Sequence, residues 1–310
     1  MTRQRLGQHF LHSSGWLDRI ARTLPLHPAE TWIEIGAGHG EMTGRLQGEG
    51  RRVMAIEMDP PLASGLRKRA AAEWPGVEVV ESDALVVDFA DLGASSFRVY
   101  GNLPYYITSP LIRRVFQAGD AVRSFHIVIQ KEVAERIVAT PGRRAYGFLS
   151  ALCQFYSRPK IVFSIPPGAF RPPPRVASAL VEMQVPGARQ DLGIGDETEF
   201  LEFIQRCFGQ KRKKLRNNLR TFVDPASVDA ALELARIDPG ARAEELPSRL
   251  LPRRIMPCTT GYKTRLMRVR DPARRLAARI GILDSRAQPV RKVGYDAVHS
   301  GGNQRSQPGR

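Results

Sequence analysis

A short apolar stretch that runs into closely spaced glycines constrains the fold of this chain more than any other feature. Residues 32–35 (Trp-Ile-Glu-Ile) lead into Gly36-Ala37-Gly38-His39-Gly40, and a helical pattern follows near residues 41–48. Glycines let a backbone turn sharply and approach a ligand without a Cβ clash. The spacing matches a dinucleotide fingerprint only in part, because Glu41 stands where the third glycine is expected. Taken alone, the loop is also compatible with a tight structural turn.

Strand and helix patterns alternate through the first half of the chain. This alternation predicts an α/β fold, a Rossmann-like and mostly parallel sheet with helices on both faces. One helix is expected to begin after Ser109-Pro110, with Ser109 as its N-cap. Residues 159–165 and 176–185 look extended, and we expect them to pair as the last strands of the sheet. The other expected elements are strands at 52–57, 77–81, 97–100 and 125–129 and helices at 14–24, 60–73, 131–139 and 146–156.

Composition divides the chain into three parts. Residues 1–188 hold the alternating pattern, and the segment PGARQDLGIG at 186–195 has the composition of a linker. Residues 196–246 repeat apolar side chains at helical period and predict a small helical domain. Residues 247–310 lack glutamate and are rich in Arg, Pro and Gly, so we expect a basic, disordered tail.

The net charge and the cysteine content indicate which kinds of partner the protein binds and in which cellular compartment it works. The net charge of +16 points toward a polyanion, although residues 251–310 alone hold 14 Lys and Arg against 3 Asp. No apolar run is long enough for a membrane span, and the N-terminus does not resemble a signal peptide. The cysteines Cys153, Cys207 and Cys258 lie far apart, with no histidine at metal-ligand spacing. We therefore expect a cytoplasmic protein without a metal site and with no membrane partner.

Two acidic residues follow the strands after the glycine loop. Glu57 ends the next expected strand and can accept hydrogen bonds from two ribose hydroxyls. Asp83 ends the third and can accept one from an adenine amine. Taken singly, each is more often a solvated charge at a strand end. Together with Gly36 and Gly38 they describe a nucleoside pocket without a phosphate cradle, which suits S-adenosylmethionine better than NAD or ATP.

The segment Gly101-Asn102-Leu103-Pro104-Tyr105 closes the fourth strand and is the most specific signal in the chain. The Asn102 side-chain oxygen and the Pro104 carbonyl can each accept a hydrogen bond from an exocyclic amine and so aim its nitrogen at a methyl donor. Tyr105 offers an aromatic face on which an extruded base can stack. A structural turn is the alternative interpretation, and the glycine loop upstream disfavours it.

At this point the chain resembles the ribosomal RNA adenine N6-dimethyltransferases. The resemblance covers roughly residues 3–246 and is closest to the bacterial enzyme that dimethylates two adjacent adenines near the 3′ end of small-subunit (16S) rRNA. It rests on the segments at residues 6–11 (LGQHFL), 34–40, 56–59, 82–84, 102–105, 130–136, 170–176 (FRPPPRV) and 208–219 (FGQKRKKLRNNL).

The resemblance implies a role for each of two domains and a set of site residues. It makes residues 1–188 the S-adenosylmethionine-binding catalytic domain and residues 196–246 the rRNA-recognition domain. Phe170 would sandwich the target base against Tyr105, and His9 stands where many members have asparagine. The implied cofactor contacts are His9, Leu11, Gly36, Gly38, Glu57, Asp83 and Asn102.

The resemblance also implies an RNA partner, the assembling 30S particle, bound by a monomer. Basic residues would contact its phosphates, in the N-terminal arm and in a run that is otherwise a solvated helix face. These candidates are Arg3, Arg5, Lys211, Arg212, Lys213, Lys214 and Arg216.

Three other functions stay open at this stage. The macrolide-resistance methylases share the motifs but modify large-subunit rRNA, and the segments at 130–136 and 210–219 favour the small-subunit enzyme. A non-catalytic factor in ribosome assembly or transcription is disfavoured by the intact segment 102–105. An NAD oxidoreductase is disfavoured by the glycine spacing.

Overall fold

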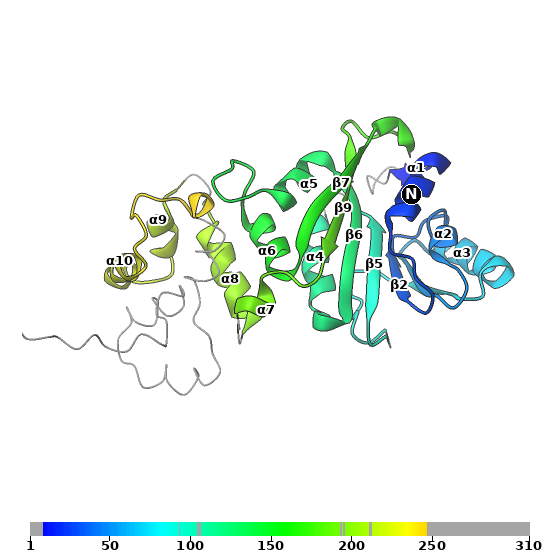
Figure 1. Cartoon of the computed structure of the whole chain (residues 1–310), viewed down its shortest axis with the longest axis horizontal. Coiled ribbons are helices and arrows are strands. Elements are labelled where there is room, and N and C mark those ends of the chain that lie inside the picture. The colour runs from blue at the N-terminus through cyan, green and yellow to red at the C-terminus, as the bar shows by residue number, and fades with distance from the viewer. Residues whose placement is uncertain are drawn as a thin grey trace, which may run out of the picture.

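A computed structural model describes residues 9–92, 94–103, 107–192, 194, 196–210 and 213–246 (Figure 1). The expected tail at 247–310 therefore lies outside the described residues, as do Arg3 and Arg5 of the N-terminal arm. None of the helices in the described ranges is long and apolar enough to cross a membrane.

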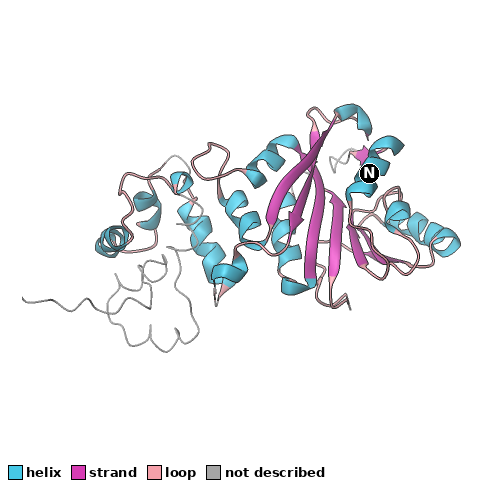
Figure 2. Cartoon of the chain, in the orientation of Figure 1, coloured by secondary structure: helices cyan, strands magenta, loops and turns pink. Residues whose placement is uncertain are grey.

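A seven-stranded sheet forms the centre of the molecule (Figure 2). Five neighbouring strands run parallel, and the last two pair antiparallel, which confirms the expected mostly parallel α/β sheet. The order reverses at β2, because β3 lies on one side of it and β5 on the other, and open sheets of this kind bind ligands at such a switch point. In sheet order the strands are β4 (Val77–Glu81), β3 (Arg52–Glu57), β2 (Thr31–Ile35), β5 (Phe97–Asn102), β6 (Val122–Gln130), β9 (Ser178–Gln184) and β7 (Arg158–Ile165).

Helices cover both faces of the sheet, which explains why β2 is almost continuously apolar. Trp32 packs on one face with α1 and α2, whereas Ile33 and Ile35 pack on the other with α4, α5 and α6. All three side chains are at most 3% exposed. A strand buried on both faces shows no alternation of apolar and polar residues. The helices are α1 (Ser14–Thr23), α2 (Thr43–Leu46), α3 (Pro60–Glu73), α4 (Thr108–Phe116), α5 (Lys131–Val138) and α6 (Phe148–Tyr156).

Two helices differ from the sequence expectation. Helix α4 begins at Thr108 with Ile107 as its N-cap, so the prediction that Ser109 is the N-cap was wrong. Pro110 then occupies the first turn, where its missing N–H has no intrahelical partner to lose. Helix α2 is a single turn, shorter than the expected 41–48, because the chain becomes extended at Gln47.

Helices continue beyond the sheet. Residues 186–195 include the short helix α7 (Arg189–Leu192) where only a linker was expected, followed by α8 (Glu197–Cys207), α9 (Leu215–Leu219) and α10 (Pro225–Leu234). The ring centroids of Phe200 on α8 and Phe155 on α6 lie 4.8 Å apart. One apolar core therefore continues from the sheet into these helices. They form the end of the molecule opposite α3 (Figure 1).

Short elements complete the described chain. Strands β1 (Phe10–Leu11) and β8 (Phe170–Arg171) pair antiparallel in a separate small sheet. Three single 3-10 turns are η2 (Gly119–Ala121), η3 (Pro167–Ala169) and η4 (Ala243–Glu245).

Candidate active site

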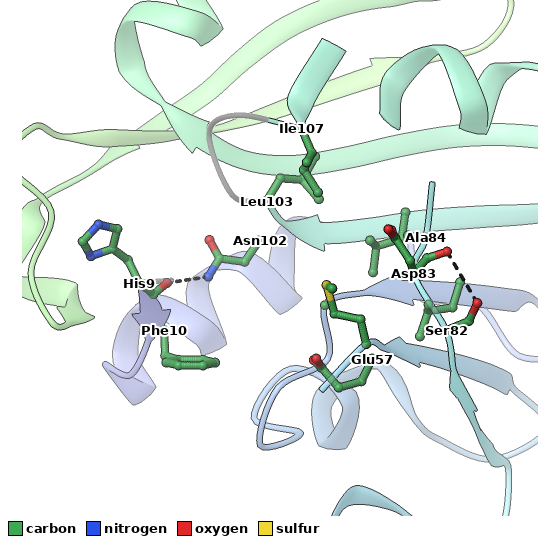
Figure 3. Close-up of a pocket in the computed structure, with 13 residues that line it drawn as sticks. His9, Phe10, Glu57, Ser82, Asp83, Ala84, Asn102, Leu103 and Ile107 are labelled. Carbon is green, nitrogen blue, oxygen red and sulfur yellow. Dashed lines mark hydrogen bonds between the residues drawn. The ribbon is translucent and has the colours of Figure 1, made fainter. Parts of the chain in front are cut away.

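A pocket opens at the carboxyl ends of β2, β3, β4 and β5, beside the switch point (Figure 3). Its walls come from segments that are distant in sequence: the N-terminal segment, the ends of the four strands and the residue before α4. Among the predicted site residues, those that line it are His9, Gly36, Glu57, Asp83 and Asn102.

The glycine loop brings the backbone close to its neighbours. The N–H groups of Gly36 and Ala37 both donate to the Ile56 carbonyl, which ties the loop to β3. At Gly40 the φ angle is +86°, and a Cβ would lie 2.6 Å from a methyl carbon of Leu66 and 3.0 Å from the ring of Trp74. Glycine is therefore required at this turn by both conformation and space.

The Glu57 carboxylate is held rigidly at the mouth of the pocket. It is 3% exposed, and its Oε2 accepts a hydrogen bond of 2.8 Å from the Gly38 N–H while its Oε1 accepts one of 2.9 Å from the Asp59 N–H. Because each carboxylate oxygen carries two lone pairs, each can accept one more donor. A pair of vicinal hydroxyls supplies two such donors. Gly38 itself does not line the pocket, and its N–H acts on Glu57.

Asp83 stands on the wall formed by β4. Its Oδ1 accepts a hydrogen bond of 2.9 Å from the Leu85 N–H, which fixes the side chain in the turn that follows the strand. Figure 3 shows Asp83 and Asn102 on different sides of Glu57. The carboxylates of Glu57 and Asp83 thus offer acceptors at the ends of adjacent strands.

A second buried acid, Glu34, lies on β2, two residues before the glycine loop. It is 2% exposed, and the Thr43 hydroxyl donates to its Oε2. The pKa of Glu34 is raised to about 8, mainly by burial and also by the nearby carboxylates of Glu41 and Glu57, while the hydrogen bond from Thr43 opposes the rise. The side chain is therefore largely neutral at pH 7. Sequence reasoning did not single it out, although an acid between two isoleucines of a strand buried on both faces is a sign of such a group.

Asn102 joins the pocket to the N-terminal segment. Its Nδ2 donates a hydrogen bond of 3.0 Å to the carbonyl of His9 (Figure 3). The His9 ring is in turn hydrogen-bonded through Nδ1 to the carbonyl of Pro172 at 2.7 Å. Through these two bonds the amide of Asn102 has a defined orientation, with Nδ2 toward His9 and Oδ1 on the other side.

Two predicted site residues, Leu11 and Phe170, do not line the pocket, and two others lie outside the described residues. Pro104 and Tyr105 lie outside the described residues. Leu11 and Phe170 are 5% and 3% exposed and pack in the core cluster around α1, so the ring of Phe170 is covered here. Its proposed stacking on a base would require that ring to become exposed. Sequence reasoning also missed Phe10, whose ring borders the pocket and packs edge-on against His39.

The candidate RNA contacts on α9 and in the segment before it differ from one another. Lys211 and Arg212 lie outside the described residues, whereas Lys213 and Lys214 are exposed. Arg216 donates two hydrogen bonds of 2.6 Å to Asp229, and a bidentate pair of this kind offsets its charge. The two lysines are therefore better placed than Arg216 to meet a phosphate. Among the described residues, no group of three His, Cys, Asp or Glu is arranged to hold a metal ion.

Comparison with known proteins decides the family. The sequence model of the family "Ribosomal RNA adenine dimethylase" matches residues 1–254. The chain belongs to this family. That result confirms the resemblance drawn from the motifs, and it extends the match slightly beyond residue 246.

Two relatives of similar sequence agree with this assignment. The chain is 39% identical over 246 residues to the ribosomal RNA small subunit methyltransferase A of Acinetobacter baylyi, with 79% of this chain and 88% of the relative covered. It is 40% identical over 245 residues to the protein of the same name from Acidobacterium capsulatum, with 78% and 86% covered.

Two solved structures share the fold. A dimethyladenosine transferase from Plasmodium falciparum superposes with a TM-score of 0.66 at 24% identity, over 78% of this chain and 94% of that one. The 23S rRNA methyltransferase ErmE gives a TM-score of 0.58 at 24% identity, over 77% and 95%. The Rossmann-like methyltransferase fold expected from the sequence is thereby confirmed.

Proposed function

We propose that this protein is an S-adenosylmethionine-dependent enzyme that dimethylates N6 of two adjacent adenines near the 3′ end of 16S rRNA. The observation that carries the proposal is that Glu57 and Asn102, from strands on either side of β2, face one pocket in a chain of the adenine dimethylase family. The small subunit is favoured over the large because the relatives from Acinetobacter baylyi and Acidobacterium capsulatum carry a small-subunit name.

The residues present fit S-adenosylmethionine. Glu57 has one lone pair on each oxygen for the ribose hydroxyls, and Asp83 offers an acceptor for the adenine amine. The loop is unsuited to a pyrophosphate, because the acidic residue Glu41 stands where the loop leads into the helix. When bound, the cofactor supplies the methyl group.

Asn102 would act on the target adenine by positioning. Its Oδ1 accepts a hydrogen bond from the exocyclic amine, which localises the nitrogen lone pair and aims it into the pocket. The nitrogen would form the new carbon–nitrogen bond as the bond between the methyl group and sulfur breaks, which leaves S-adenosylhomocysteine, and it would then lose a proton to solvent. The Pro104 carbonyl would accept the second hydrogen bond of the amine, and the ring of Tyr105 would stack on the extruded base. Phe170 would stack on the other face only after its ring, which is 3% exposed, has been uncovered.

Binding of the RNA would use basic residues away from the pocket. Lys213 and Lys214 are exposed on the helical part, and we assign them, with Lys211, Arg212, Arg3 and Arg5, to contacts with phosphates. In this proposal residues 1–188 form the catalytic domain and residues 196–246 recognise rRNA. We also propose that the enzyme works in the cytoplasm, as a monomer, on assembling 30S particles.

Primer extension across both rRNAs tests this function. Particles lacking the modification are incubated with the protein and S-adenosylmethionine, and reverse transcription is then read for stops. We expect a stop at two adjacent adenines near the 3′ end of 16S rRNA. A stop only in 23S rRNA would reject the proposal in favour of a large-subunit methylase, and no stop in either would favour a non-catalytic role.

A further inference from the structure

The segment at residues 9–13, called here the N-terminal strap, lies along one side of the candidate site and is hydrogen-bonded to the segment at 169–172. Its strand β1 pairs Phe10 with Arg171, and the N–H groups of His12 and Ser13 both donate to the Ala169 carbonyl. On the pocket side, the Phe10 ring lies 3.1 Å from where a Cβ on Gly38 would stand. The strap therefore connects the glycine loop to the segment at 169–172.

His9 contributes to this strap through two different parts of the residue. Its carbonyl faces Asn102, whereas its ring turns away from Asn102 (Figure 3). The ring is hydrogen-bonded to the carbonyl of Pro172. A backbone carbonyl can only accept a hydrogen bond, so Nδ1 of His9 must carry the hydrogen in the 2.7 Å bond to Pro172.

The position of the His9 carbonyl decides which end of the Asn102 amide faces the reacting amine. With Nδ2 donating to that carbonyl at 3.0 Å, Oδ1 is the atom left to accept from the substrate. If the amide were rotated by half a turn, Oδ1 would oppose the His9 carbonyl, acceptor against acceptor, and Nδ2 would point its hydrogens at the amine. Such an arrangement would repel the substrate nitrogen rather than orient it.

We propose that His9 is a positioning residue for methyl transfer, whose ring, anchored on Pro172, holds its own carbonyl where it fixes Asn102 with Oδ1 toward the target amine. This inference rests on the proposed function for its consequence in catalysis. The geometry of the link from Pro172 through His9 to Asn102 is independent of it, and so can be tested separately.

Substitutions that keep or move the ring donor test the proposal. In His9→Asn the side-chain nitrogen is attached to Cγ, as Nδ1 of histidine is, so it can still donate to Pro172. In His9→Gln the nitrogen is one atom farther away, and His9→Ala has no donor. We expect His9→Gln and His9→Ala to lower kcat about tenfold, the loss of one hydrogen bond. KM for rRNA should not change, and His9→Asn should retain the wild-type kcat.

The matched control lies in the same strap. His12 is exposed, and His12→Ala should leave kcat unchanged. Thermal unfolding of every variant separates a loss of stability from a loss of positioning. Equal kcat for His9→Gln and His9→Asn, or a wild-type kcat for His9→Ala, would overturn the proposal.

A spectroscopic measurement keeps the inference separate from the proposed function. In nitrogen-15 labelled protein, the side-chain NH₂ signal of Asn102 is identified by its absence in Asn102→Ala. We expect His9→Ala to shift this signal and His9→Asn to leave it in place. An unshifted signal in His9→Ala overturns the link even if the enzyme is active. A shifted signal in a protein without methyl transfer would support the link and reject only the proposed function.

Discussion

The side-chain nitrogen of Asn102 donates a hydrogen bond to the carbonyl of His9, a residue 93 positions earlier in the chain. The bond is the point at which the N-terminal strap meets the end of β5. This hydrogen bond orients Oδ1 of Asn102 toward the pocket that Glu57 and Asp83 also line. One side-chain orientation thus joins the predicted cofactor site to the predicted site of the target base.

Without the side-chain amide of Asn102, the exocyclic amine of the target adenine should no longer be oriented toward the methyl donor. We expect Asn102→Ala to lower kcat by about a hundredfold, the range seen when one oriented polar contact to a reacting group is removed. Asn217→Ala is the control, because Asn217 is exposed on α9 and remote from the pocket. Methyl transfer is measured with both variants at saturating rRNA. An unchanged kcat in Asn102→Ala would remove this residue from the mechanism.

Glu57 should determine the affinity for the methyl donor. In Glu57→Gln one acceptor becomes an NH₂ group that faces the N–H of either Gly38 or Asp59. We expect binding of S-adenosylhomocysteine, measured by calorimetry, to weaken about tenfold or more. The matched control is Glu81→Gln, since Glu81 pairs with Glu57 across β3 and β4 but is exposed and bound to Arg67. Equal affinities for the two variants would contradict this role of Glu57.

Substitution by alanine should change the free energy of unfolding in opposite directions at two glycines, Gly40 and Gly65. At Gly40 the positive φ and the contacts with Leu66 and Trp74 leave no room for a methyl group, so we expect Gly40→Ala to lower the free energy of unfolding by about 2–3 kcal/mol. Gly65 is exposed within α3, and no atom lies within 4 Å of where its Cβ would stand, so Gly65→Ala should raise it by about 0.5–1 kcal/mol. Urea unfolding measures both, and destabilisation by Gly65→Ala would conflict with the helix as described.

The buried acid Glu34 should make stability depend on pH. Its pKa is about 8 in the folded protein against 4.5 for the ordinary group, so between these values unfolding releases a proton. The free energy of unfolding therefore falls as the pH rises from about 4.5 to about 8, by an amount on the order of a few kcal/mol. Glu34→Gln keeps an acceptor for Thr43 and removes this contribution.

The measurement is urea unfolding at pH 5 and at pH 8. We expect Glu34→Gln to gain stability relative to the wild type on going from pH 5 to pH 8, whereas the exposed Glu49→Gln should show no such gain. Parallel behaviour of Glu34→Gln and the wild type would mean that Glu34 is already ionised in the folded protein.

The sequence predicted the central sheet well because local pattern decides it. The bounds of β3 and β4 agree with the expectation, since each is rich in apolar and β-branched residues and is closed by Glu57 or Glu81. The start of α4 was misplaced because Ser109 and Pro110 suit an N-terminus locally, whereas the helix also includes Ser109 and the buried Thr108 (2% exposed).

The candidate site was only partly predictable for a related reason. The acids at the strand ends follow from topology, which gathers the carboxyl ends of parallel strands. The bond between His9 and Asn102 depends on where the N-terminal segment folds back, and no periodicity encodes that. The same holds for Phe170, whose burial beside α1 is a tertiary contact, and for the pairing of Arg216 with Asp229.

The central claim is that this pocket delivers methyl groups to adenine in small-subunit rRNA. The most direct test is mass spectrometry of nucleosides from a 3′ fragment of 16S rRNA, after unmodified 30S particles have been incubated with the protein and isotope-labelled S-adenosylmethionine. We expect labelled N6,N6-dimethyladenosine at two adjacent positions with the wild type, and almost none with Asn102→Ala. Unlabelled adenosine at both positions after incubation with folded wild-type protein would contradict the claim.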